Sequence, residues 1–192
     1  MTQLIIVHPE SHLNKLVNGV SEYCKEIKPD KIYLIEQFGE FGRLFNKNII
    51  DVLAIDEENI GYSPHGWFKL RGQREGQAPQ DVENMNNIYK KIISEGSEIV
   101  LMGSFLGNRF FQTNEYAGHE TNGCVGRALM DMVEGKGDLE IYLPKKFVFH
   151  NKTKLCEGDL TLAQYLAPKG YSISENEDFL LVQPTVKVQT AG

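Results

Sequence analysis

Cysteine and long hydrophobic runs are scarce in this sequence, and their scarcity excludes several classes of protein. The three cysteines, Cys24, Cys124 and Cys156, are widely spaced and form no short motif. This spacing argues against a disulfide framework or a zinc ribbon and fits a reducing compartment. No apolar run approaches the ~20 residues of a membrane span, and the run 4–7 is too short for a signal-peptide core. We therefore expect a cytoplasmic protein that does not enter membranes.

An excess of positive charge is also missing. Twenty Lys and Arg stand against 26 Asp and Glu, and the formal net charge of −6 gives no general attraction for nucleic acid or anionic lipid. The most basic stretch holds Lys69, Arg71 and Arg74, but Glu75 follows directly, which is typical of a solvated loop. With 41% apolar and 24% charged residues, the composition is that of an ordinary globular protein. We predict a single domain over 1–192 that takes a small-molecule ligand and no nucleic acid.

The common cofactor motifs are absent as well. The segment 103–107 is not followed by the Gly-Lys-Ser/Thr of a phosphate-binding loop, and no G-x-G-x-x-G follows the first apolar run. His8, Glu10 and His12 could be considered as metal ligands, but they fall across a strand-to-helix turn, and His12 is more typical of a surface residue. The sequence therefore predicts neither a cofactor nor a metal site.

Short apolar runs alternate with patterns of helical period, and this alternation indicates the fold class. The predicted strands are 4–7, 31–37, 49–55, 99–102, 139–143, 147–149 and 179–182. Helices are predicted from a cap at Ser11 to Pro29, from Asp81 to Gly96, from Thr121 or Asn122 to Gly135, and from Asp159 to Leu166. We expect an α/β protein, a three-layer α/β/α sandwich whose mostly parallel sheet has about five or six strands.

Two long connections stand out in this pattern, 56–80 and 103–120. The first is rich in Gly and Pro and predicts a loop. In the expected fold, ligands bind beyond the carboxyl ends of the strands. The second connection should therefore lie near a ligand site, as a flap that follows a central strand at 99–102.

Cys124 is the best candidate for chemistry. If a helix starts at Asn122, Cys124 lies in its first turn, where free N–H groups and the helix dipole stabilise a thiolate and can hold an oxyanion. The other interpretation is a small buried residue at a close helix-strand approach, with Gly123 and Gly126 present for packing. Cys24 lies on an apolar helix stripe and Cys156 among charged residues, and neither has a comparable argument.

The run Thr121-Asn122-Gly123-Cys124-Val125, followed by Ala128, Asp131 and the strand 139–143, resembles the nucleophile segment of the isochorismatase-like cysteine hydrolases. The resemblance implies an α/β/α hydrolase fold with a cysteine nucleophile. It also implies an Asp at the end of the first strand and a Lys on an intervening loop.

Two features depart from the family pattern. His8 occupies the place where the resemblance implies the Asp, and Glu10 is the nearest carboxylate. The stretch 104–120 is inserted where the family passes directly from strand to nucleophile turn.

Lys69 is the only Lys of the long middle loop and therefore the best match to the family's Lys.

The inserted stretch could itself bind a ligand. Its aromatic rings, Arg and amides suit a planar ring or a nucleobase. The alternative is a structural flap whose aromatics only cover the sheet. The predicted ligand-binding residues are Phe105, Asn108, Arg109, Phe110, Phe111, Tyr116, Thr121, Asn122 and Gly123.

The leading hypothesis is a small-molecule cysteine hydrolase that acts on an amide, ester or vinyl-ether substrate. Cys124 would be the nucleophile, Glu10 or His8 would accept its proton, and Lys69 would orient the acid and the substrate. The alternative is a non-catalytic α/β protein that holds a nucleotide-like ligand or a protein partner through 104–120. The sequence leaves open whether the chain is a monomer or a homo-oligomer.

Overall fold

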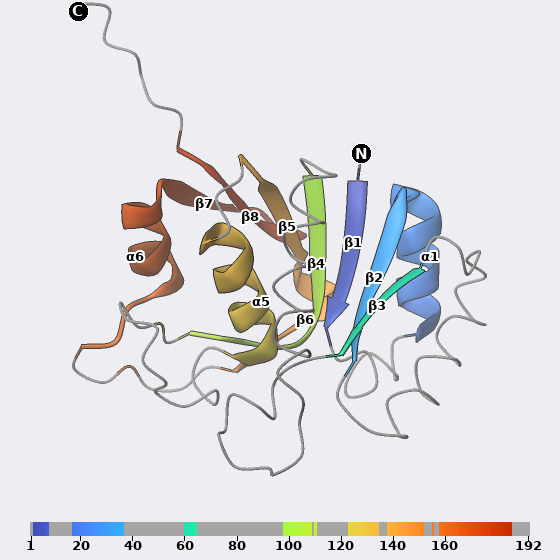
Figure 1. Ribbon diagram of the computed structural model, residues 1–192, viewed down its shortest axis with the longest axis horizontal. Coiled ribbons are helices and arrows are strands. Elements are labelled where there is room, and N and C mark those ends of the chain that lie inside the picture. The colour runs from blue at the N-terminus through green and yellow to red at the C-terminus, as the bar shows by residue number, and fades with distance from the viewer. Residues whose placement is uncertain are drawn as a thin grey trace, which may run out of the picture.

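The computed structural model shows a mixed β-sheet with helices packed against it (Figure 1). Of the 192 residues, the structure describes 2–7, 17–36, 60–64, 98–108, 110, 123–134, 138–151, 155 and 158–185. The strands are β1 (Thr2–Val7), β2 (Lys31–Glu36), β3 (Ile60–Pro64), β4 (Glu98–Gly107), β5 (Glu140–Pro144), β6 (Val148–Asn151), β7 (Tyr171–Glu175) and β8 (Phe179–Pro184). The helices are α1 (Val17–Ile27), α5 (Gly123–Glu134) and α6 (Leu162–Leu166), with 3-10 turns η3 (Lys145–Phe147) and η4 (Ala167–Lys169).

The sheet has eight strands in the order β3-β2-β1-β4-β5-β8-β7, and β6 pairs with β4 outside this path. The pairs β1·β2, β1·β4, β2·β3, β4·β5 and β4·β6 are parallel. Only β8 runs antiparallel to its neighbours β5 and β7. The α/β class, the mostly parallel sheet and the interior position of the two most apolar strands are therefore confirmed.

The central strands are apolar along their whole length because both of their faces are covered. Leu4 to Val7 in β1 and Ile99 to Met102 in β4 are buried, and each pairs with a neighbour in register, such as Ile5 with Leu101. A strand exposed on one face would alternate polar and apolar residues instead. The core of the protein is centred on this pair of strands.

Helices cover both sides of this centre. In Figure 1, α5 lies to the left of β4, against which it packs, whereas α1 lies behind β2. α1 buries Val20 and Cys24, which are four residues apart and therefore on one side of the helix. It ends as the sequence predicted, because Lys28 adopts φ 46° and donates its N–H to the Cys24 carbonyl at 2.9 Å, with Pro29 directly after it.

Several predicted boundaries were wrong. A strand, Ile60–Pro64, lies within the stretch predicted as a loop at 56–80, and its parallel register with β2 supplies the backbone pairing that its weak apolar pattern does not reveal. The connection predicted from residue 103 begins only after Gly107, because β6 offers β4 a second partner. Strand β7 was not predicted, because its sequence, Tyr-Ser-Ile-Ser-Glu, is half polar. The strand is stabilised by its pairing with β8.

The cap of α6 was also misplaced. Thr161, and not Asp159, begins this helix, and it forms a capping box with Gln164. The Thr161 side chain accepts from the Gln164 N–H at 3.3 Å, and the Gln164 side chain accepts from the Thr161 N–H at 2.8 Å. The predicted strand at 49–55, the helix at 81–96 and the start of the first helix at 11–16 lie outside the described residues.

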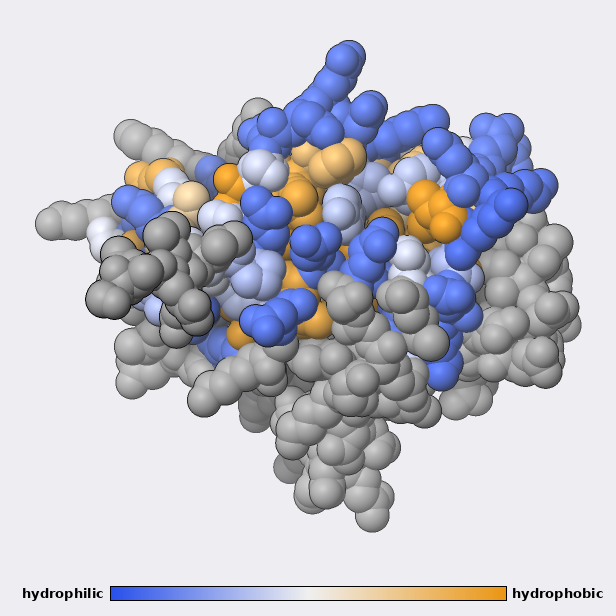
Figure 2. Space-filling view, turned by 90° about the horizontal axis from the view of Figure 1, so that it is seen from above, coloured by the Kyte–Doolittle hydropathy of each residue, from blue (hydrophilic) through white to orange (hydrophobic). Residues whose placement is uncertain are grey.

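The amino ends of the strands form a hydrophilic edge. Figure 2 shows the molecule from this end, and most of the coloured surface is hydrophilic with small, separate apolar areas. Thr2 and Asp30 close the edge between β1 and β2, since the Thr2 N–H donates to Asp30 Oδ2 at 2.7 Å and the Asp30 N–H donates to the Thr2 carbonyl at 2.8 Å. This edge therefore has a structural role, and the opposite edge is the place to look for function.

Gln3 is the one polar side chain of β1 that is fully buried, and neither its Nε2 nor its Oε1 finds a hydrogen-bond partner among the described residues. A buried amide without a partner costs about 1–3 kcal/mol.

We predict that Gln3→Leu raises the free energy of unfolding by about that amount, measured by urea denaturation. Gln3→Glu, which has the same shape and adds a charge, should lower it; a Gln3→Leu protein less stable than the wild type would contradict this account of Gln3.

Candidate functional site

The carboxyl ends of β1 and β4 mark the point where the order of strands reverses. The chain passes from β1 through α1 to β2 on one side, whereas β4 lies on the other side of β1. In open α/β sheets, this switch point leaves a place for ligands beyond the strand ends. Val7 and Gly103 are the last paired residues of the two strands there.

Gly103 allows β1 and β4 to approach each other at this point. Its φ is 138°, a conformation that side-chain-bearing residues rarely adopt, and a Cβ at this position would lie 2.0 Å from the Val7 carbonyl oxygen. Beyond Gly103, β4 exchanges partners: Leu106 pairs with His150 and Gly107 with Asn151 of β6. The glycine thus marks where β4 leaves β1 and turns along β6.

Cys124 lies in the first turn of α5, as the sequence predicted. The helix begins at Gly123, whose φ of 71° requires a residue without a Cβ, and it runs back from the carboxyl edge of the sheet along β4 (Figure 1). The Cys124 side chain is half-buried and packs against the core. The first backbone N–H groups of a helix such as this 12-residue one have no partner within the helix itself.

Cys24 offers a contrast within the same protein. Its side chain is only 6% exposed in the core, and burial raises the pKa of its thiol to about 11. A thiol in this environment is protonated and inaccessible at neutral pH, so Cys24 is a structural residue. Among the described cysteines, only Cys124 combines partial exposure with a place at the carboxyl edge.

The predicted ligand-binding residues are in different environments. Asn108 is half-buried and directly follows β4, and Phe105 belongs to β4 itself. Phe110 is completely buried, forms both backbone hydrogen bonds of a bridge with Leu160 at 2.8 and 2.9 Å, and packs against Tyr165 with ring centroids 5.5 Å apart. The geometry therefore gives the Phe110 ring a core position. His8, Glu10, Lys69, Arg109, Phe111, Tyr116, Thr121 and Asn122 lie outside the described residues.

A row of three charged residues follows Cys124 along α5: Arg127, Asp131 and Glu134. Of these, only Asp131 was part of the sequence resemblance. Arg127 Nε lies 3.0 Å from Asp131 Oδ1, and both side chains are about one-fifth exposed, at 21% and 19%. Arg127 is three residues after Cys124, so it lies one turn away on the same side of the helix. The i,i+4 spacing of Arg127 and Asp131 was a readable signal for this ion pair.

Asp131 is the carboxyl of this row whose ionisation is most disturbed. Burial raises the pKa of Asp131 to about 6, against the opposing effect of Arg127. Seven residues of helix separate it from Cys124, a rise of about 10 Å, which is too far for direct proton transfer. Asp131 instead pairs with Arg127.

The row ends in a second cluster that joins α5 to α6 and η4. Glu134 Oε1 accepts from the Tyr165 hydroxyl at 2.7 Å and pairs with Lys169 Nζ at 3.3 Å. These two donors lower the pKa of Glu134 even though its partial burial acts in the opposite direction. The cluster fixes α6 against the end of α5 and has no geometric relation to the carboxyl edge.

No family model matches the chain, and no curated protein is detectably similar to it. Among the described residues, His, Cys, Asp and Glu side chains form no group of three or more that could hold a metal ion. None of the helices in the described part of the chain is long and apolar enough to cross a membrane. The candidate site is therefore defined by its geometry alone.

The raised pKa of Asp131 predicts a pH dependence of stability. Because the folded state holds this proton more tightly than the unfolded state, the stabilisation is complete below the ordinary pKa of 3.8 and is lost as the pH rises through about 6. Between these values, we expect the wild type to lose up to about 3 kcal/mol of unfolding free energy relative to Asp131→Asn. Urea denaturation at a series of pH values measures this difference.

Arg127→Met provides the matched control for this experiment. Since Arg127 lowers the pKa of Asp131, its removal should extend the pH-dependent loss of stability to higher pH. Parallel pH profiles for the wild type and Asp131→Asn would show that Asp131 is not disturbed by burial.

Proposed function

We propose that this chain is a small-molecule cysteine hydrolase of the isochorismatase-like type, with a three-layer α/β/α fold and Cys124 as its nucleophile. One observation carries the proposal: a half-buried cysteine in the first turn of a helix, at the carboxyl edge where the order of strands reverses. The position of α1 and α5 on opposite sides of the sheet supports the three layers (Figure 1). The substrates that fit this chemistry are small amides, esters or vinyl ethers.

In the proposed reaction with an amide or ester substrate, the Cys124 thiolate attacks the carbonyl carbon. The carbonyl electrons move to oxygen, and the backbone N–H groups near Gly123 and Cys124 hold the resulting oxyanion. Collapse of this intermediate expels the amine or alcohol, which takes up a proton, and leaves a thioester on Cys124. Attack by water on the thioester releases the acid and restores the thiol.

The acid-base groups of this proposal come from segments that follow strand ends. Glu10 or His8 follows β1 and would accept the thiol proton, and Lys69 would orient that acid and the substrate. The end of β1 at Val7 is paired with Gly103 at the carboxyl edge, which is consistent with a contribution from the segment after β1 to the same site.

Asn108 favours a second function, the non-catalytic binding of a small molecule. This half-buried residue directly follows β4 at the carboxyl edge, at the start of the connection that the sequence predicts to hold a ligand. In this alternative, Cys124 is only a packing residue. Loss of the Cys124 thiol should then leave ligand binding unchanged, whereas Asn108→Ala should weaken it by about 1–3 kcal/mol.

The test is acylation of Cys124 by a reactive ester. We expect the wild type to hydrolyse p-nitrophenyl acetate and to carry an acetyl group on the peptide that contains Cys124, detected by mass spectrometry after rapid quenching. Cys124→Ala should reduce the catalysed rate by about a thousandfold or more, because it removes the bond-forming atom. Cys24→Ser is the matched control, since a buried thiol should contribute nothing to the rate.

Two outcomes would contradict the hydrolase proposal. One is turnover that is equal in the wild type and in Cys124→Ala. The other is a wild type that neither hydrolyses esters and small amides nor acquires an acetyl group on Cys124.

A further inference from the structure

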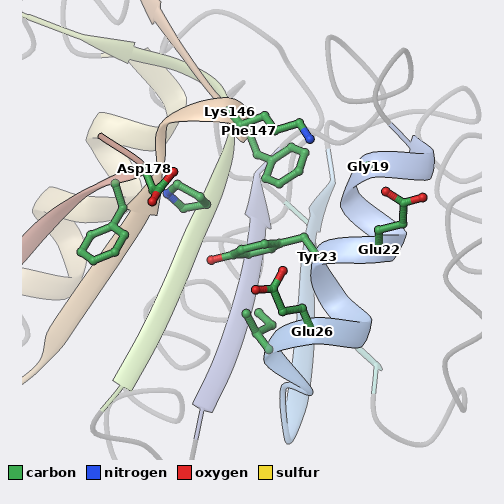
Figure 3. Close-up of a pocket in the computed structure, with 10 residues that line it drawn as sticks. Gly19, Glu22, Tyr23, Glu26, Lys146, Phe147 and Asp178 are labelled. Carbon is green, nitrogen blue, oxygen red and sulfur yellow. The ribbon is translucent and has the colours of Figure 1, made fainter. Parts of the chain in front are cut away.

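A pocket of about 520 Å³ lies on the α1 side of the sheet, away from α5 and Cys124 (Figure 3). Its volume falls within the range of about 300–1,000 Å³ that is usual for small-molecule sites. It opens between α1, the end of β5 with η3, and the turn from β7 to β8. The lining residues are Gly19, Glu22, Tyr23, Glu26, Ile27, Pro144, Lys146, Phe147, Asp178 and Phe179.

The turn that forms one wall is fixed by its own hydrogen bonds. Asn176 Oδ1 accepts from the N–H groups of Asp178 at 2.9 Å and Phe179 at 2.8 Å. The Asp178 carbonyl accepts from the Lys145 N–H at 2.8 Å, and Phe179 pairs with Pro144 in the sheet. Asp178 therefore has a defined place at the rim of the pocket.

The floor of the pocket is aromatic. Tyr23 of α1 and Phe147 of η3 pack with ring centroids 5.3 Å apart and planes tilted by 50°. Phe147 is only 2% exposed, whereas Tyr23 is half-buried and presents part of its ring to the pocket (Figure 3). A Cβ on Gly19 would lie 3.5 Å from the Phe147 ring, so this glycine brings the helix close to the floor.

The rim of the pocket carries an excess of negative charge from two directions. Glu22 and Glu26 lie one turn apart on α1, Asp178 lies on the turn across the pocket, and among the lining residues a single ammonium group, that of Lys146, offsets these charges. Like charges one turn apart destabilise a helix, so this placement is costly without a cation. No ion pair to these three carboxylates is found within the described part of the chain. Burial, and then the nearby charges that include Glu26 and Asp178, raise the pKa of Tyr23.

The pocket already accommodates an ammonium group of the chain itself. Lys146 Nζ lies 5.4 Å from the centroid of the Phe147 ring, within the range of a cation–π contact. The same atom would be 3.8 Å from a Cβ on Gly19. An aromatic floor that takes a lysine ammonium offers the same kind of contact to a ligand cation.

We propose that this pocket binds a small organic dication of the aliphatic diamine class. The three carboxylates, spread over both sides of the pocket, provide partners for two separate ammonium groups. The methylene chain between these groups would lie on the exposed part of the Tyr23 ring. An inorganic cation would gain nothing from this apolar floor, and an anion would meet the negative rim. The site is separate from the proposed hydrolase site, so a failure of one proposal would not affect the other.

Isothermal titration calorimetry of the full chain at low salt tests this proposal with three probes of similar length: diaminobutane, butylamine and butanediol. We expect binding of diaminobutane, about tenfold weaker binding of butylamine, and no binding of the neutral butanediol. Glu22→Gln and Asp178→Asn should each weaken diaminobutane binding about threefold or more. Asp138→Asn, which removes the same charge from an exposed residue outside the pocket, should leave it unchanged.

Lys146→Met gives a prediction of opposite sign. Removal of this ammonium relieves repulsion of the ligand's own ammonium groups, so diaminobutane should bind more tightly. The proposal is overturned if diaminobutane does not bind, if butanediol or magnesium ion binds as well as diaminobutane does, or if Asp138→Asn is as damaging as the pocket variants. It is also overturned if Lys146→Met weakens binding, because Lys146 would then be a partner for an anionic group.

Discussion

The parallel pairing of β1 with β4 is the interaction on which the rest of the structure depends. Leu4 to Val7 and Ile99 to Met102 are almost completely buried, and each such aliphatic side chain contributes about 1.5–3 kcal/mol on burial. Strands covered on both faces require helices on both sides, which α1 and α5 supply (Figure 1). The pairing also positions the candidate site, because the helix that carries Cys124 packs on β4.

The elements that the sequence predicts well are those whose own residues determine them. Continuous apolar runs identify β1 and the first part of β4, and helical spacing identifies α1 and α5. Strands β3 and β7 escape prediction because they depend on backbone pairing with β2 and β8, which no local pattern encodes. The continuation of β4 to Gly107 likewise depends on β6, a partner more than 40 residues further along the chain.

The residues of the candidate site also divide into those that the local sequence predicts and those that it does not. Cys124 in the first turn of a helix follows from the local sequence, since Gly123 begins the helix with a positive φ. The position of Phe110 does not follow from the local sequence, because an aromatic residue in a polar connection fits either a ligand pocket or the core. Only the bridge to Leu160 and the contact with Tyr165 give it a core position. The pocket of Tyr23 and Phe147 unites residues more than 120 positions apart, so no spacing rule could reveal it.

The central claim is that the fold makes Cys124 a reactive thiol. The most direct measurement is the rate of its alkylation by iodoacetamide near neutral pH, followed by mass spectrometry of peptides and compared with a short, unstructured cysteine peptide. The account predicts that Cys124 reacts about tenfold or more faster than this peptide and faster than Cys24 or Cys156, because the helix terminus stabilises its thiolate. A rate for Cys124 equal to or below that of the unstructured peptide would contradict the account.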